Sequence, residues 1–162
     1  MKQLAPILIA SMFAVALMGA DSTSKSTLTV KTAVAANCAL QSPQGIDFGT
    51  YDPSSNGTVD AQVDALQIQC TKGSAGVSIA LDNGQYYNGT HRTMRTAGGN
   101  GAVFYEIYTA AARSVVWNRT QTVTYVAATS QPVKITLYGR VLGATAATPG
   151  DYSDTLTALV NF

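Results

Sequence analysis

The chain has 162 residues, with ten Lys and Arg against nine Asp and Glu, so its formal net charge is +1. Charged residues make up only 12% of it and form no basic or acidic run, which argues against nucleic acid and anionic membrane surfaces as partners. The length suits one domain with a sizeable core, and the abundance of Thr, Ala, Gly and Val is typical of a β-rich protein outside the cytoplasm.

The first twenty residues have the pattern of an export signal. Lys2 gives a positive start, an apolar run follows from Leu4 to Met18, and Gly19 and Ala20 are small closing residues. Because the run is short for a membrane span, we predict a signal peptide over residues 1–20, with an uncleaved membrane anchor as the alternative. Cleavage would leave 142 residues with nine basic and nine acidic side chains, a net charge of zero.

The two cysteines, Cys38 and Cys70, both follow the predicted signal. Exported chains with an even number of cysteines usually pair them, so we predict a disulfide. In the chain-entropy model a loop of this length contributes about 3.5–4 kcal/mol. A metal site is the alternative, but two cysteines and the distant His91 supply too few ligands. We therefore expect no metal and no cofactor.

Short alternating runs separated by turn residues predict an all-β sandwich or barrel. The expected strands lie at residues 27–36, 46–51, 65–70, 77–81, 92–95, 103–108, 114–117, 122–126, 132–139 and 152–162. Residues 82–84 and 98–101 are predicted turns. Residues 118–121 would join their two neighbouring strands in a hairpin, and residues 143–150 would form a loop of small residues.

The two terminal runs are the most informative. The last run places Leu156, Ala158, Val160 and Phe162 on one face of a strand, and the sequence shows neither a turn nor a partner strand after it. The first run, just after the signal, alternates Leu28, Val30, Thr32 and Val34 in the same way. A fold that is short of a strand at one end and has a spare strand at the other predicts subunits that complete one another.

Candidate catalytic residues are few. The single histidine, His91, lies in a Gly-, Asn- and Thr-rich stretch and is interpreted as a solvated loop residue, since no nucleophile-elbow motif accompanies it. Asp151 and Asp154 are close in sequence, and we expect them to cap a turn and line an exposed face. The glycine-rich turn at 98–101 lacks the Lys of a phosphate site. We therefore expect no enzyme and no small-molecule substrate.

Five motifs, in order along the chain, carry a resemblance to a known family. They are T-L-T-V-K-T-A-V-A-A-N before Cys38, then I-D-F-G-T-Y, L-Q-I-Q-C ending at Cys70, F-Y-E-I-Y-T-A-A-A-R, and the final G-D-Y-S-D-T-L-T-A-L-V-N-F. Over residues 26–162 the sequence resembles the spore coat protein U-like domain family, and within it the major subunits of Csu-type archaic chaperone–usher pili. The final motif is the most specific of the five.

The resemblance implies an incomplete immunoglobulin-like β-sandwich that lacks its last strand and is completed by donor-strand complementation. Residues 21–36 would be the N-terminal donor segment and residues 37–162 the pilin domain. The donor side chains would be Leu28, Val30, Thr32 and Val34, and the acceptor groove would be lined by Leu156, Ala158, Val160 and Phe162. Thr32 is a departure, because a larger apolar side chain would fill its pocket better. The alternative for residues 27–36 is the first strand of a closed sandwich.

In function, the resemblance implies a structural subunit of a surface pilus that is exported through the periplasm and supports adhesion and biofilm formation. Its partners would be identical subunits in a linear polymer, a periplasmic chaperone and an outer-membrane usher. A second hypothesis is a secreted spore-coat or matrix protein of the same fold that forms no pili. A third is a small secreted carbohydrate-binding or hydrolytic β-domain.

Overall fold

The computed structural model describes residues 24–55, 57–145 and 147–162, so the predicted signal peptide lies outside the described residues. Eight strands and one short 3-10 helix make up the regular structure of these residues. They are β1 (Cys38–Gln41), η1 (Pro53–Ser55), β2 (Val59–Cys70), β3 (Ser78–Leu81), β4 (Arg92–Met94), β5 (Ala102–Tyr108), β6 (Val123–Thr124), β7 (Val133–Thr145) and β8 (Ala158–Asn161). No helix in the described ranges is long and apolar enough to cross a membrane.

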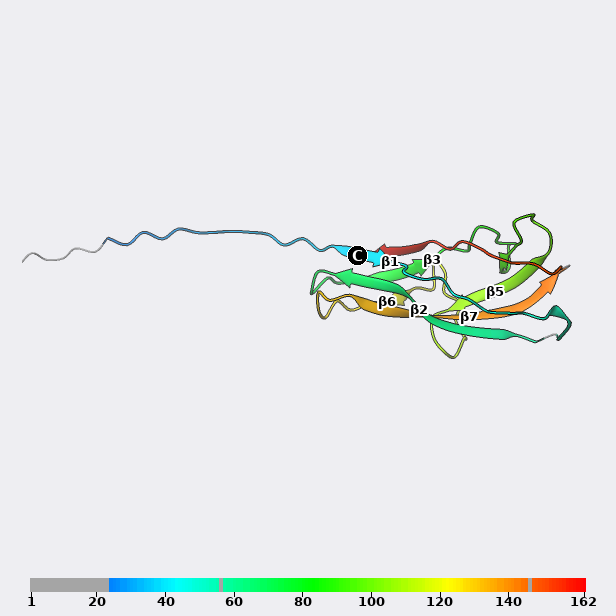
Figure 1. Cartoon of the computed structure of the whole chain (residues 1–162). Helices are drawn as coiled ribbons and strands as arrows, with labels where there is room; N and C mark the ends of the chain where they lie inside the picture. Colours follow the sequence, from blue (N-terminus) through cyan, green and yellow to red (C-terminus); the bar gives the residue numbers. More distant parts are fainter. Residues whose placement is uncertain (1–23, 56, 146) are drawn as a thin grey trace, which may run out of the picture. The chain divides into compact units, whose positions relative to one another are not determined.

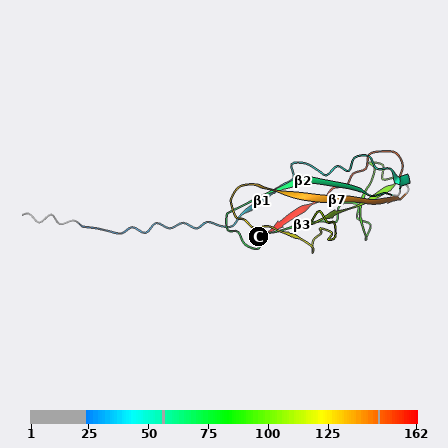
Figure 2. The same ribbon diagram turned by 90° about the horizontal axis from the view of Figure 1, so that it is seen from below.

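The strands of the domain, residues 34–162, form two antiparallel sheets (Figures 1 and 2). One sheet has the order β1-β2-β7-β5-β4 and the other the order β6-β3-β8. The core is apolar, and its fully buried side chains include Ile68, Ile79, Ile107, Trp117 and Val141. The predicted all-β sandwich is therefore confirmed.

A disulfide joins Cys38 to Cys70, as predicted. The two residues face one another in the antiparallel register of β1 and β2. The bond therefore attaches the first strand of the domain directly to a strand in the interior of the five-stranded sheet.

Three local predictions differ from the structure. The hairpin between 114–117 and 122–126 is absent, because Val116 bridges to Tyr108 and β6 pairs with β3. Residues 46–51 form no strand, although Ile46 and Phe48 pack against the core as their alternation predicted. The last regular strand is shorter than residues 152–162, because only Ala158–Asn161 joins a ladder.

Residues 24–33 are a separate unit without regular secondary structure. The side chains of Leu28 and Val30 are 88% and 85% exposed. Val34, at the start of the domain, is 80% exposed. A row of apolar side chains left almost fully in water is costly for a protein unless a partner covers it.

Candidate functional site

Two edge strands, β1 and β8, lie beside one another without pairing (Figure 1). β1 is the last strand of the five-stranded sheet and β8 the last strand of the three-stranded sheet. Each therefore has one edge without a ladder among the described residues. Unpaired N–H and C=O groups along a strand edge are a template for the addition of another strand.

The residues that were predicted to line the acceptor groove lie along the free edge of β8 and of the segment before it. Asp82 donates its amide to the Thr157 carbonyl at 2.9 Å, and Gln85 donates to the Thr155 carbonyl at 3.2 Å. The odd-numbered residues of this segment thus direct their backbone groups toward β3 and the turn that follows it. Since alternate residues of a strand point to opposite edges, Leu156, Ala158 and Val160 direct theirs toward the unpaired edge.

The side chains of the same segment alternate between the core and solvent. Leu156, Ala158 and Val160 are half-buried and pack against the core cluster. Phe162 is 55% exposed, so it lies farther out than the other three. Whether these four residues accept a donor strand stays a prediction.

The wall that faces Leu156 and Ala158 across the groove was not predicted from the sequence to be part of a site. Ile46 and Phe48 turn inward from a segment without backbone pairing and pack against the core. Gly139 in β7 makes this packing possible, because a Cβ atom there would lie 2.6 Å from Ile46 and 2.7 Å from Phe48. Phe48 also meets the ring of Tyr105, with centroids 6.0 Å apart. The signal that could have identified this wall was the alternation that turns Ile46 and Phe48 inward in a segment without a neighbouring strand.

Two adjoining cavities lie between these walls. The first, of about 280 Å³, is lined by Ile46, Phe48 and Leu66 on one side and by Leu156 and Ala158 on the other, among further residues. The second, of about 680 Å³, is lined chiefly by residues 46–53 and 147–152. Ile46, Phe48, Met94 and Tyr152 line both, so the cavities form one groove.

Two aspartates fix the wall that precedes β8. Asp154 accepts hydrogen bonds from the Tyr105 hydroxyl at 2.7 Å and from the Gln85 amide at 2.9 Å. Asp82 accepts bonds from the amides of Thr157 at 2.9 Å and Gly84 at 3.0 Å. The expectation that Asp154 lines an exposed face is therefore wrong, because its carboxylate is drawn to a buried tyrosine. Hydrogen bonds to these two carboxylates therefore hold the wall in place where no β-ladder does.

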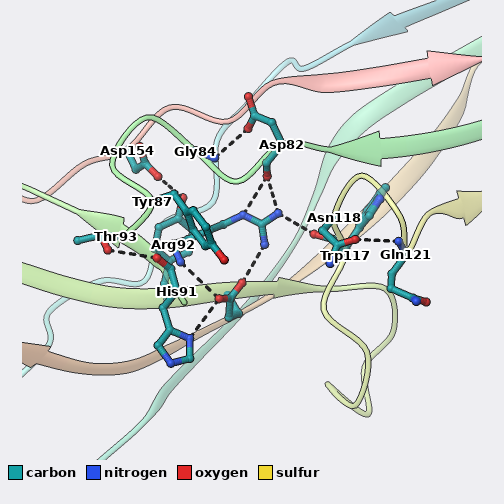
Figure 3. Close-up of polar contacts among 12 residues, drawn as sticks. Asp82, Gly84, Tyr87, His91, Arg92, Thr93, Trp117, Asn118, Gln121 and Asp154 are labelled. Carbon is teal, nitrogen blue, oxygen red and sulfur yellow. Dashed lines mark hydrogen bonds and ion pairs between the residues drawn. The ribbon is translucent and has the colours of Figure 1, made fainter. Parts of the chain in front are cut away.

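Arg92 connects the same turn to the core (Figure 3). Its guanidinium, buried in the domain, pairs with Glu106 at 2.9 Å and donates to the carbonyls of Asp82 and Trp117. The Trp117 indole in turn donates to the Ile79 carbonyl at 2.8 Å. His91 is not simply solvated, since its Nδ1 lies 3.3 Å from Glu106. Among the described residues, no buried side-chain nitrogen or oxygen lacks a hydrogen-bond partner.

Two pKa values shift near the groove. Burial, together with the hydrogen bond to Asp154, raises the pKa of the Tyr105 hydroxyl far above its usual value, so it stays a neutral donor. For Asp82, burial raises the pKa, but the amide bonds from Thr157 and Gly84 outweigh it and leave the pKa lowered. Asp82 is therefore an ionised acceptor at neutral pH.

The described residues contain no group of three or more His, Cys, Asp or Glu side chains placed to hold a metal ion. The groove has an apolar floor and the free backbone edge of β8 along one wall, and the free edge of β1 lies close to β8. Such an arrangement suits an extended peptide whose alternate side chains are apolar.

The sequence matches a known protein family. The family model of the Spore Coat Protein U domain matches residues 24–159, and the chain belongs to that family. The family is one of structural proteins and not of enzymes. A curated relative, Protein U of Myxococcus xanthus, is 29% identical over 154 residues, which cover 86% of each chain.

Two solved structures resemble this chain, and the first of them shares its fold. A chain of the chaperone–tip adhesion subunit pre-assembly complex from the archaic chaperone–usher Csu pili of Acinetobacter baumannii is 20% identical, with a TM-score of 0.55 over 80% of this chain. The alignment spans 40% of that longer chain. The P pilus rod subunit PapA, 20% identical, has a TM-score of 0.48 over 85% of this chain and 99% of PapA. The predicted immunoglobulin-like sandwich without its last strand is confirmed.

Proposed function

We propose that this chain is a structural subunit of a surface pilus, assembled by the chaperone–usher pathway through donor-strand exchange. Residues 27–36 of one copy would add as a strand between β1 and β8 of the next. The observation that carries the proposal is the pair of free edges over one groove, together with an exposed alternating segment outside the fold.

The energetics support this use of the segment. Leu28, Val30 and Val34 are at least 80% exposed, and burying each should contribute roughly 1.5–3 kcal/mol before ordering costs. The added strand would also satisfy the backbone groups of Leu156, Ala158 and Val160. A periplasmic chaperone would cover the groove until an outer-membrane usher exchanged it for the next subunit. The finished fibre would act at the cell surface in adhesion and biofilm formation.

Removal of the segment tests the proposal. The mature chain without residues 21–36 should no longer self-assemble but should still capture a synthetic peptide of residues 24–37. A self-complemented chain, in which residues 37–162 are followed by a short turn and residues 24–36, should be a stable monomer. If the truncated chain alone is a soluble, monodisperse and stable monomer, the donor role is wrong.

Two substitutions sharpen the same experiment. Val30→Asp places a charge on the face predicted to enter the groove and should abolish self-assembly, because burial of an unpaired carboxylate is prohibitive. Thr29→Asp adds the same charge on the opposite face of the segment and should leave assembly intact. Equal effects of the two substitutions would contradict a strand that inserts with one face.

The second candidate is a secreted coat or matrix protein that forms no pili, and the family's own name favours it. Negative-stain microscopy of material sheared from the cell surface separates the two. Thin fibres labelled by an antibody to this chain support the pilus. An amorphous labelled layer supports the coat protein.

A further inference from the structure

The unpaired charges of the domain are divided between the two ends of its five-stranded sheet. β2 and β7 run side by side along this sheet (Figure 1), and the twelve residues of β2 span about 35–40 Å. At one end β2 finishes at Cys70, beside the first residue of β1, and β7 begins. At the other end β2 begins at Val59, which faces Val141 of β7.

The end at Cys70 is basic. Lys72 follows β2 and Lys134 lies at the start of β7, and both are exposed. The extended segment that precedes β1 adds Lys25 and Lys31. The stretches that build this end contain neither Asp nor Glu; they are residues 34–41, 67–78, 123–135 and 158–162. We call it the basic end, defined by Lys72 and Lys134.

The end at Val141 is acidic. Three exposed aspartates, Asp47, Asp52 and Asp151, line the larger cavity together with Val141. The hydroxyl and amide of Ser54 donate to the Asp52 carboxylate and lower its pKa, so Asp52 is ionised at neutral pH. We call this the acidic end, defined by the three aspartates.

The arginines near the acidic end already have partners. Arg95 donates to the Gly99 carbonyl, while Arg113 and Arg140 both contact the Asp60 carboxylate. Of the ion pairs in the described part of the chain, none includes a residue that defines either end. The charges of the two ends are therefore available to another molecule.

The two ends cannot neutralise one another within one molecule. The length of β2 is several times the Debye length, which is about 8 Å at physiological ionic strength. Between two molecules, like ends repel and unlike ends attract. A contact between two different surfaces of the same protein is heterologous, and repetition of it builds an open filament instead of a closed dimer. A second copy of this chain is thus an occupant whose charge fits each end.

We propose that the basic end of one copy docks against the acidic end of the next, as a subunit contact in addition to the inserted strand. This proposal rests on the proposed pilus function. Lys72 and Lys134 then face Asp47, Asp52 and Asp151 of the neighbouring copy. Exposed charge pairs contribute little affinity, but complementary surfaces accelerate association and exclude wrong orientations. The contact therefore governs how fast copies meet and which ends meet.

Charge reversal in the mature chain tests the contact, with assembly followed by light scattering. Lys72→Glu combined with Lys134→Glu reverses the basic end. The control is Arg119→Glu, which makes the same change of charge as Lys134→Glu alone at an exposed position in the loop before β6, away from both ends. Each variant is also titrated with a fluorescent peptide of residues 24–37 at about 1 M salt, where charges act over only about 3 Å. This titration reports on the groove alone.

A rescue variant adds neutralisation of the acidic end to the reversed chain. Its further changes are Asp47→Asn, Asp52→Asn and Asp151→Asn, which remove the charges but keep the side-chain oxygens that accept the loop amides of Gly49 and Ser54. Because the reversed lysine positions then meet no negative charge, most of the lost rate should return.

The expected effects depend on salt. At about 0.01 M, where charges act over about 30 Å, the doubly reversed chain should assemble about tenfold more slowly or worse. Lys134→Glu should be slower than Arg119→Glu, which should stay within about twofold of the unmodified chain. At about 1 M salt all variants should assemble within about twofold of it. Peptide affinity should be the same in every variant.

Three results would overturn the end-to-end contact and leave strand exchange intact. They are an unchanged rate in the doubly reversed chain at low salt, slowing that persists at high salt, and equal slowing by Arg119→Glu and Lys134→Glu. Weaker peptide binding by the doubly reversed chain would also overturn it, because the lysines would then act through the groove. An unmodified chain that neither assembles nor binds the peptide would instead overturn the pilus function.

Discussion

The buried guanidinium of Arg92 permits a quantitative test of what holds the groove wall in place. Arg92 is 1% exposed and Glu106 5% exposed. Arg92→Met leaves the Glu106 carboxylate without its buried cation, and it leaves the carbonyls of Asp82 and Trp117 without a donor. Breaking a buried pair by removing one partner costs about 3–5 kcal/mol, which we expect as the loss in the free energy of unfolding.

The assay is guanidinium unfolding of the self-complemented chain, followed by the fluorescence of its single tryptophan, Trp117, which is fully buried. Arg92→Met with Glu106→Gln should recover at least about 1 kcal/mol, because no buried charge is then unpaired. Arg140→Met is the control, since its pair with Asp60 lies at the surface and its loss should change the free energy of unfolding far less than Arg92→Met does. A loss below about 1 kcal/mol for Arg92→Met, or no recovery in the double variant, would refute the reasoning.

Three further outcomes are expected in the same unfolding assay or in peptide binding. Gly84→Ala should destabilise the chain by clearly more than Gly73→Ala: both have positive φ, of 82° and 85°, but of the two only Gly84 would place a Cβ against a neighbour, the Asp154 carboxylate; equal losses would show that the clash is relieved. The stabilisation from Asp82 is fully present above about pH 4 and is lost as pH falls through its lowered pKa, so Asp82→Asn should weaken the pH dependence of unfolding below about pH 4; an unchanged profile would contradict this. A Thr32→Val peptide should dissociate more slowly than the unmodified one, because a buried hydroxyl without a partner costs about 1–3 kcal/mol, and an unchanged rate would show that the Thr32 hydroxyl finds one.

The sequence was sufficient where side-chain alternation and backbone pairing coincide. β3, β5 and much of β7 were predicted this way. The disulfide was predicted separately, from the export signal and the even number of cysteines. The first half of β2 was missed because its alternation changes phase. Val59, Ala61 and Val63 alternate at odd positions, a register shift follows, and Leu66 and Ile68 continue at even positions. Because a bulge separates the two alternation patterns, the sequence did not show that they belong to one long strand.

The failures elsewhere come from tertiary contacts. Trp117 was expected in a local hairpin, but its amide bonds to Ile107 and its indole to Ile79, and these buried bonds outweigh a short exposed pairing. Alternation predicted only the wall of the groove that continues into β8, whereas the role of Ile46 and Phe48 in the opposite wall and the network of Asp82, Arg92 and Asp154 were not predicted. Its members are distant in the chain, and no spacing rule connects them.

The position of the Cys38–Cys70 bond has a mechanical consequence. Tension applied along residues 24–37 reaches the first regular strand of the domain at Cys38, where β1 offers only a four-residue ladder with β2. The covalent bond passes that load directly to β2, a strand paired along both edges. A pull that would otherwise peel β1 away one hydrogen bond at a time is instead shared by the whole five-stranded sheet. The oxidised domain is thus built to bear force at the point where its extended segment begins.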